Sequence, residues 1–496
     1  MASLRILLSD DIEDLKSNLR KFTLDSLLKK IGNTSVDLLM NRNSEDEFYG
    51  ARRVRKQHNR KGSLITKTSE TTVTGWELTD LAYHAVLFTN DYRGKPIEND
   101  DEFLALVQAE TVFTSSADSN KDESVLLYLW GFVGEQIKFQ KPLMVLDNLT
   151  RDLYILFESS KGANEIDPID DIVMKEVGVN WKKVVSALFL ASFGSTYMIQ
   201  MDDFMEKLVW DEEIISRDEF CKVLEKYTST YTEIKESKLG RQVFYTTPFV
   251  KTSKKETISI NCYLNLFVYE HCIYWIVRNH YQKQNSQAFV NVFGKYFEEY
   301  FFELLSTYLE KDEYERIPEC ERKRADWKLK IGEYKFLIEQ KSALMALSVK
   351  QQDSNVAASI DYYNKAIIKA IIQLHDTELE FNEGRFIKII LLYEDYVKPE
   401  VLNYVFKLKS CTVENDYYYW IVTIDEMERL LSLCSTNRDL FYRIIQEKIR
   451  RENEVTHEGR SIYQLLLEKG ISDNPYLKLE KFQDYRDIAF KDDSEG

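Results

Sequence analysis

Glycine and proline are scarce in this chain, which has only 17 glycines and 7 prolines among its 496 residues. These two residues supply the tight turns on which all-β folds depend, and both disfavour helix interiors. Their scarcity therefore favours long helices over a turn-rich all-β fold. A hydrophobic content of 44% with 30% charged residues excludes wholesale disorder. The length allows roughly two to four packed units.

The hydrophobic pattern divides the chain into four regions. Helical spacing dominates residues 1–240, which we expect to form an all-helical region with a role in regulation, sensing or oligomerisation. Residues 241–284 hold an expected hairpin, with strands at 243–250 and 256–264, and then a connecting helix. From 285 to 434 helices alternate with apolar strands, which predicts an α/β core with a mixed central sheet. Residues 435–496 carry two helical patterns and are expected to form a C-terminal cap, so the predicted fold class is α+β.

Neither a leader nor a membrane span is expected. The short apolar start is followed directly by Asp10, Asp11 and Glu13, unlike a secretory signal. The longest uncharged run, Val184–Met201, includes several Ser and Thr residues and predicts a buried helix. The six cysteines never approach the Cys-x-x-Cys spacing of zinc sites. We therefore expect a cytoplasmic protein with reduced thiols and no membrane partner.

The net charge of −16 disfavours a nucleic-acid partner at first sight, because phosphate binding requires basic surface. The acidity is uneven, however. Residues 101–250 hold 15 basic and 26 acidic residues, whereas residues 251–450 hold 28 and 30. Two basic runs offer phosphate contacts without sequence readout. They are Arg52, Arg53, Arg55 and Lys56 in the first run, for which a solvated loop is the alternative, and Arg322, Lys323 and Arg324 in the second.

The candidate catalytic residues lie in the stretch RADWKLKIGEYKFLIEQK at 324–341. Alternation along two expected strands, joined by a turn at 331–333, places Asp326 on one strand opposite Glu339 and Lys341 on the other. Two carboxylates can hold a hard divalent cation such as Mg²⁺, which activates water and polarises a phosphoryl group. A nearby Lys can orient that water or stabilise the developing negative charge. This arrangement suits phosphodiester hydrolysis.

These residues resemble the PD-(D/E)XK nuclease superfamily, whose fold is restriction-endonuclease-like. Asp326 lies thirteen positions before Glu339, which is followed by Gln340 and Lys341. The resemblance implies that Asp326 and Glu339 bind Mg²⁺, or Mn²⁺ as a substitute, with the Gln340 carbonyl, and that Lys341 contributes to catalysis. It also implies a metal-binding acid on the preceding helix, for which Glu298 is the candidate, and a polar position near the site at Gln373. Ala325 stands where the literal motif has Pro.

The resemblance further implies an endonuclease that acts on DNA. A helical module joined to such a domain resembles bacterial anti-phage defence or restriction components, which is an analogy. The acidic helical region is then expected to bind a protein partner or to form a homo-oligomer. Two alternatives stay open. One is a non-catalytic helical scaffold whose degenerate nuclease-like domain binds nucleic acid or a protein partner, and the other is a solvated Glu–Lys pair on an edge strand.

Overall fold

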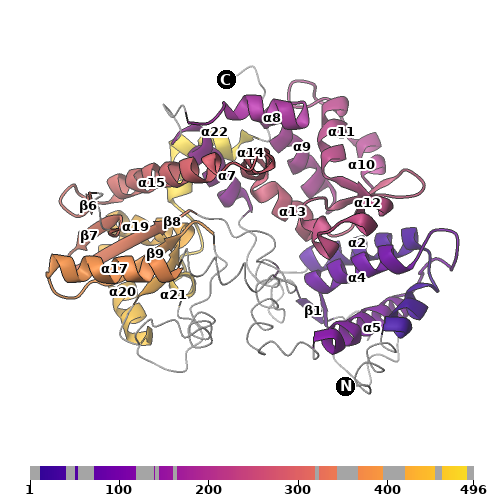
Figure 1. Cartoon of the computed structure of the whole chain (residues 1–496), viewed down its shortest axis with the longest axis horizontal. Coiled ribbons are helices and arrows are strands. Elements are labelled where there is room, and N and C mark those ends of the chain that lie inside the picture. The colour runs from indigo at the N-terminus through magenta and orange to yellow at the C-terminus, as the bar shows by residue number, and fades with distance from the viewer. Residues whose placement is uncertain are drawn as a thin grey trace.

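The computed structural model describes residues 12–40, 51–53, 72–118, 139, 145–159, 165–318, 323–342, 367–394, 419–452 and 461–488. These residues form an arch with a sheet-containing lobe at one end and a helical lobe at the other (Figure 1). The helices α7 (Val145–Phe157), α14 (Cys272–Lys283) and α15 (Ala288–Tyr308) lie along the top of the arch. Within the described part of the chain, no helix has the length and apolar character needed to cross a bilayer.

The sheet of the first lobe has five strands, in the order β10-β9-β8-β7-β6. Their bounds are β6 Tyr314–Arg316, β7 Trp327–Ile331, β8 Tyr334–Lys341, β9 Ile387–Leu392 and β10 Trp420–Thr423. The ladders β6–β7 and β7–β8 are antiparallel, whereas β8–β9 and β9–β10 are parallel. The mixed sheet predicted between 285 and 434 is therefore present.

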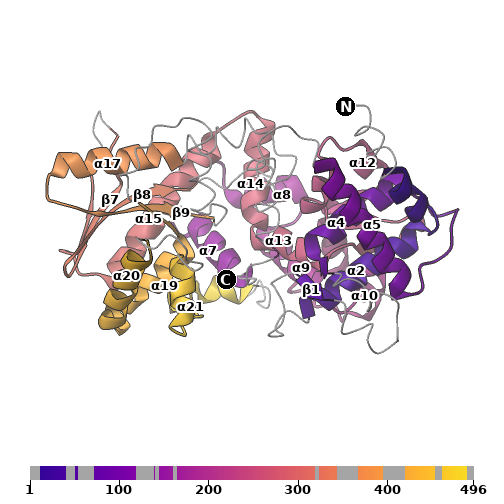
Figure 2. The ribbon, with the colours of Figure 1, turned by 90° about the horizontal axis from the view of Figure 1, so that it is seen from below.

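Helices cover this sheet on both faces, as Figure 2 shows. Alternate residues such as Trp327, Leu329 and Ile338 enter a core shared with α15, α19 (Ile424–Thr436) and α20 (Arg438–Glu452). The opposite face packs against α17 (Lys369–Phe381), mainly over β8 and β9. The period-2 alternation of β7 and β8 thus sets which side chains face α17.

The other helices confirm most of the helical predictions. Their bounds are α2 Leu24–Met40, α4 Gly75–Phe88, α5 Asp100–Asp118, α8 Ile169–Val177, α9 Trp181–Gly194, α10 Met201–Lys207, α11 Arg217–Lys226, α12 Tyr231–Glu236, α13 Cys262–Glu270, α21 Ile462–Glu468 and α22 Gln483–Arg486. The helical pattern across 169–200 forms two helices, because Gly178 ends α8 with a positive φ of 83°. The uncharged run from Val184 lies largely in α9, where most side chains are buried as predicted.

The prediction that residues 1–240 are all-helical is wrong. Strands β1 (Ala51–Arg53) and β2 (Thr72–Thr74) pair with each other, and β3 (Thr228–Thr230) pairs in parallel with β4 (Phe249–Lys251). These strands are only three residues long, too short to show a sequence period, so their neighbours decide their conformation.

The predicted hairpin is shorter than expected. Its antiparallel ladder joins β4 to β5 (Thr257–Ser259), and each of these strands is three residues long. The residues before β4 form a 3₁₀ helix, Gly240–Tyr245, and Pro248 has no N–H to extend the ladder. After β5, the Asn261 side chain accepts a hydrogen bond from the Tyr263 N–H and begins α13.

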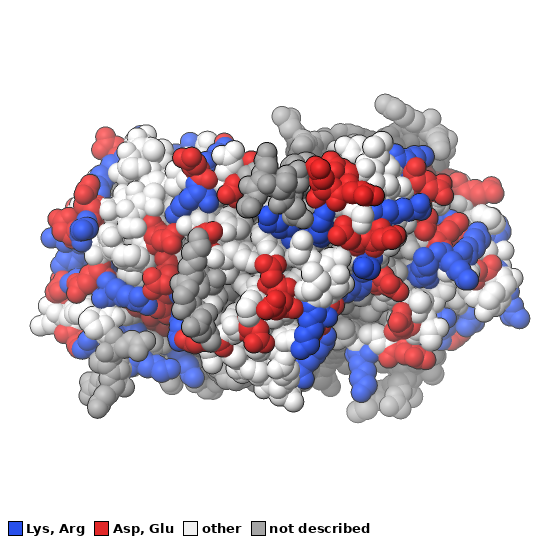
Figure 3. Space-filling view, turned by 90° about the horizontal axis from the view of Figure 1, so that it is seen from above, with Lys and Arg blue, Asp and Glu red and all other residues white. Residues whose placement is uncertain are grey.

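Two hydrophobic cores hold the arch together. One combines the sheet with α15, α19, α20 and the helices from α7 to α11, and it spans residues 145–488. The other is formed by α2, α4 and α5 together with residues between Ile234 and Phe267. Helices from the first half of the chain therefore share a core with the sheet. Acidic and basic side chains are interspersed over the face of the molecule seen in Figure 3.

Candidate active site

The β7–β8 hairpin brings Asp326 beside Glu339, as the sequence predicts. Trp327 lies opposite Ile338 in the ladder, so the next positions along the two strands are Asp326 and Glu339. The Asp326 N–H donates to the Ile338 carbonyl at 3.0 Å, and the Gln340 N–H donates to Asp326 Oδ2 at 2.6 Å. The Asp326 carboxylate is therefore fixed by the backbone of the strand that carries the second acid.

Glu339 projects from β8 toward the α17 side of the sheet, where its side chain is only 3% exposed. Lys341 Nζ, two residues further along, donates to Glu339 Oε1 at 2.5 Å. The second oxygen, Oε2, is buried and has no hydrogen-bond partner among the described residues. A buried carboxylate oxygen without a partner is unfavourable unless another group, such as a cation, satisfies it.

The two carboxyl groups perturb one another. Burial and the neighbouring Glu339 charge raise the pKa of Asp326 to about 8, although the Gln340 N–H opposes the shift. Burial also raises the pKa of Glu339, against the opposing effect of Lys341. The charge on Glu298 raises both pKa values further. The pair therefore favours a proton or a metal ion over two bare negative charges.

Helix α17 anchors the segment that leads into Asp326. The Ala325 N–H donates to Thr377 Oγ1 at 2.9 Å, and Gln373 Nε2 donates to the Arg324 carbonyl at 3.3 Å. Thr377 in turn donates to the Gln373 carbonyl at 2.7 Å. Gln373 thus lies near the site as the resemblance implies. Thr377 was not among the predicted residues, although its place one helical turn after Gln373 is a usable signal.

The Gln340 side chain points away from the acids, into the layer between the sheet and α15. Its Oε1 accepts from Trp327 Nε1 at 2.6 Å, and its Nε2 donates to the Phe297 carbonyl at 3.3 Å. Only the backbone carbonyl of Gln340 is then a candidate metal ligand, which is the group that the resemblance implies.

Glu298, the third candidate acid, is engaged by a residue that the sequence analysis did not identify. Arg316 on β6 donates through Nη2 to Glu298 and through Nη1 to Glu299 at 3.0 Å. Its guanidinium also lies 5.6 Å from the centre of the Trp327 ring. Glu298 is therefore close enough for its charge to raise the pKa values of Asp326 and Glu339, while its own carboxylate is paired with Arg316.

The predicted phosphate-binding residues have different placements. Lys323 is exposed, and its positive charge opposes the rise in the pKa of Glu339. Arg324 donates through Nε to Glu380 on α17 at 2.8 Å. A pocket of about 750 Å³ opens between Lys323 and α17. Arg322, Arg55 and Lys56 lie outside the described residues, and Arg52 and Arg53 are described only as backbone of β1.

A divalent cation fits the Asp326–Glu339 pair. Glu339 offers a buried carboxylate oxygen without a partner, and the raised pKa of Asp326 shows that its carboxylate favours a bound cation or proton. Among the described residues, no three His, Cys, Asp or Glu side chains are grouped so that they could hold a metal. The fit therefore rests on two carboxylates and the Gln340 carbonyl.

Comparison with family models, curated proteins and solved structures finds no match to this chain.

Proposed function

We propose that this protein is a metal-dependent nuclease that hydrolyses phosphodiester bonds. The observation that carries the proposal is the Asp326–Glu339 pair, with Lys341 in contact with Glu339 and one buried carboxylate oxygen unpartnered. Paired acids next to an ammonium group, at the end of strands, are the residue types that phosphoryl hydrolysis requires.

Each residue has a distinct role in this proposal. Asp326, Glu339 and the Gln340 carbonyl would hold Mg²⁺ or Mn²⁺, which supplies an activated water and charge compensation when bound. Lys341 lies on the same strand face and can donate to a phosphate oxygen or hold the attacking water in place. The Gln340 N–H keeps Asp326 oriented toward Glu339, while Thr377 and Gln373 hold the preceding backbone.

The arrangement of elements supports the resemblance to the PD-(D/E)XK superfamily. A long helix, α15, precedes an antiparallel β7–β8 hairpin that carries the acids, and α17 separates this hairpin from the parallel strand β9. By the same analogy we propose a DNA substrate, a cytoplasmic location and a role in anti-phage defence or restriction. The helical lobe would then bind a protein partner or a second copy.

A second candidate function is nucleic-acid or protein binding without hydrolysis. The engagement of Glu298 by Arg316 favours it, since an arginine that neutralises the third acid weakens the site for a metal. In that case the Asp326–Glu339 pair would be a remnant in which one of the two carboxyls is protonated.

Cleavage assays separate the two candidates. Purified full-length protein is incubated with plasmid, linear duplex, single-stranded DNA and RNA, with Mg²⁺, Mn²⁺ or EDTA. We expect metal-dependent cleavage that Asp326→Asn and Glu339→Gln each reduce by about a hundred- to a thousandfold, the order reached when a charge-stabilising group is lost. Glu310→Gln, at an exposed position after α15, is the matched control and should cleave at the wild-type rate. Undiminished cleavage in EDTA or by Glu339→Gln would exclude the proposed site.

A further inference from the structure

Three lysines share the strand face that carries the candidate site. On β7, Lys328 and Lys330 follow Asp326 at two-residue intervals, so they project to the same side of the sheet. On β8, Lys335 lies directly opposite Lys330, and Leu337 lies opposite Lys328. We call Lys328, Lys330 and Lys335 the lysine shelf.

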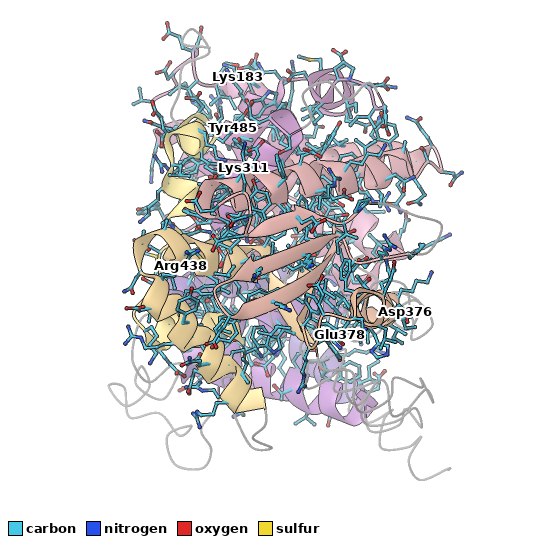
Figure 4. The ribbon with its side chains drawn as sticks, turned by 90° about the vertical axis from the view of Figure 1, so that its left-hand side faces the viewer. Lys183, Lys311, Asp376, Glu378, Arg438 and Tyr485 are labelled. Carbon is cyan, nitrogen blue, oxygen red and sulfur yellow. The ribbon has the colours of Figure 1, made fainter. Side chains whose placement is uncertain are left out.

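The helix that covers this face reaches Lys328 at its end and leaves Lys330 uncovered. The Lys328 ammonium lies 4.8 Å from the centre of the Phe381 ring, and the Lys328 side chain is 19% exposed. α17 packs mainly over β8 and β9, and it ends at Phe381, where Asn382 adopts a positive φ of 49°. Among the described strands, β7 lies second from one edge of the sheet, next to β6. Lys330 is exposed and Lys335 is half-buried. In Figure 4 the strands run across the front of this lobe, and α17, marked by Asp376 and Glu378, lies beside them.

The shelf has more positive than negative charge. Glu383, in the turn after α17, accepts from Lys328 Nζ at 2.6 Å, and its backbone carbonyl accepts from Lys335 Nζ at 2.8 Å. The Lys328 hydrogen bond lowers the pKa of Glu383, and the charges of Lys335 and Lys330 act in the same direction. One exposed carboxylate thus faces three ammonium groups.

Neighbouring elements leave the lysines in excess. Glu315 on β6 lies opposite Lys328 and adds one acid. Lys388 on β9 is paired with Glu378 at 2.5 Å. Lys330 and Lys335 therefore remain directly opposite each other in an antiparallel ladder. Repulsion between the two like charges destabilises the sheet unless an anion lies beside them.

We propose that the lysine shelf holds the phosphate backbone of a nucleic-acid strand whose scissile bond lies at Asp326 and Glu339. This inference rests on the proposed function and adds the surface along which the substrate runs. Lys330 lies four positions after Asp326, which corresponds to about 13 Å along the strand. A polyanion of that length relieves the repulsion between the lysines and needs no sequence readout. DNA and RNA share this backbone chemistry.

Binding measurements on the full-length chain test the shelf. In a Glu339→Gln background, fluorescence anisotropy is recorded with labelled single-stranded and duplex DNA and RNA at several salt concentrations. Replacing both Lys330 and Lys335 by Ala should weaken binding at least about fivefold and reduce the salt slope by about 2, one for each lost phosphate contact. Lys330→Arg with Lys335→Arg should restore both. The control pair, Lys235→Ala with Lys238→Ala, removes two exposed lysines of the helical lobe and should change neither.

The outcomes distinguish this inference from the proposed function. If the wild type cleaves but the Ala pair binds all four probes with unchanged affinity and slope, the shelf is overturned and the nuclease stands. If the wild type cleaves nothing but the Ala pair loses binding, the shelf stands as a nucleic-acid surface and hydrolysis falls. If the Glu339→Gln chain binds none of the probes, or if the Arg pair fails to restore binding, the shelf is overturned.

Discussion

Asp326 is the residue whose chemistry most depends on its surroundings. Its carboxyl has a pKa of about 8 in the folded chain, because burial and Glu339 disfavour its charge. In the unfolded chain the group titrates near its ordinary value. Between these pH values the folded state binds a proton that the unfolded state lacks, so stability falls as the pH rises.

This shift gives a prediction for metal-free protein. The wild type should lose free energy of unfolding between pH 5 and pH 8, and Asp326→Asn should lose less, since Asn carries no titrating charge. Chemical unfolding at the two pH values measures the difference. Asp376→Asn, on the exposed side of α17, is the control and should follow the wild type. Equal pH dependence in wild type and Asp326→Asn would show that Asp326 is not perturbed.

Only some of the residues that form the site could be predicted from the sequence. Asp326, Glu339 and Lys341 follow from strand alternation and motif spacing, because the hairpin register depends on local sequence. Arg316 could not be found in this way. It reaches Glu298 and Glu299 from a three-residue strand on the sheet edge, and the pairing depends on how β6 docks beside α15.

The β7–β8 hairpin is the element that creates the site. Its two strands are joined at Gly332 and Glu333, and Gly332 has a positive φ of 60°. A Cβ at Gly332 would also lie 2.5 Å from the Tyr442 hydroxyl of α20. The turn therefore needs glycine for its backbone conformation and for its close approach to α20.

Gly332→Ala should destabilise the protein by about 1–2 kcal/mol, the cost of a left-handed conformation for a residue with a Cβ. Thermal or chemical unfolding measures this loss. Glu333→Ala, at the neighbouring exposed position, is the matched control and should stay within about 0.5 kcal/mol of the wild type. A Gly332→Ala protein as stable as the control would show that the turn tolerates a side chain.

Elements with a strong internal pattern were predicted well, and short ones were not. The strands at 323–330, 335–341, 385–394 and 417–424 are apolar enough to identify, and all four appear within a few residues of the predicted bounds. β3 and the 3₁₀ helix at Gly240–Tyr245 depend instead on their neighbours, because three to six residues carry no readable period.

At the scale of the whole molecule, a buried ionic network joins the first half of the chain to the last. Arg151 on α7 donates to both oxygens of Glu428 on α19, at 2.7 Å each. Tyr300 of α15 and Asn474 also donate to Glu428, both at 2.5 Å. The predicted boundaries at 240 and 285 stay predictions, but a fragment beginning at 240 would lose Arg151 and much of the shared core.

Arg151→Met should therefore destabilise the full-length protein by about 3–5 kcal/mol, because Glu428 would be left charged, buried and without its arginine. Equilibrium unfolding in denaturant measures the effect. Adding Glu428→Gln should recover part of the loss, since the uncompensated charge is then removed. If the single variant unfolds at the same denaturant concentration as the wild type, the network contributes nothing to joining the two halves.

Electron paramagnetic resonance of Mn²⁺ tests whether Asp326 and Glu339 together hold a divalent cation. Mn²⁺ is titrated into full-length protein with a short DNA duplex, and the signal of free Mn²⁺ reports the amount bound. We expect the wild type and Glu310→Gln to bind Mn²⁺, and both Asp326→Asn and Glu339→Gln to lose that binding. Equal Mn²⁺ binding by all four proteins, or none by the wild type, would contradict this expectation.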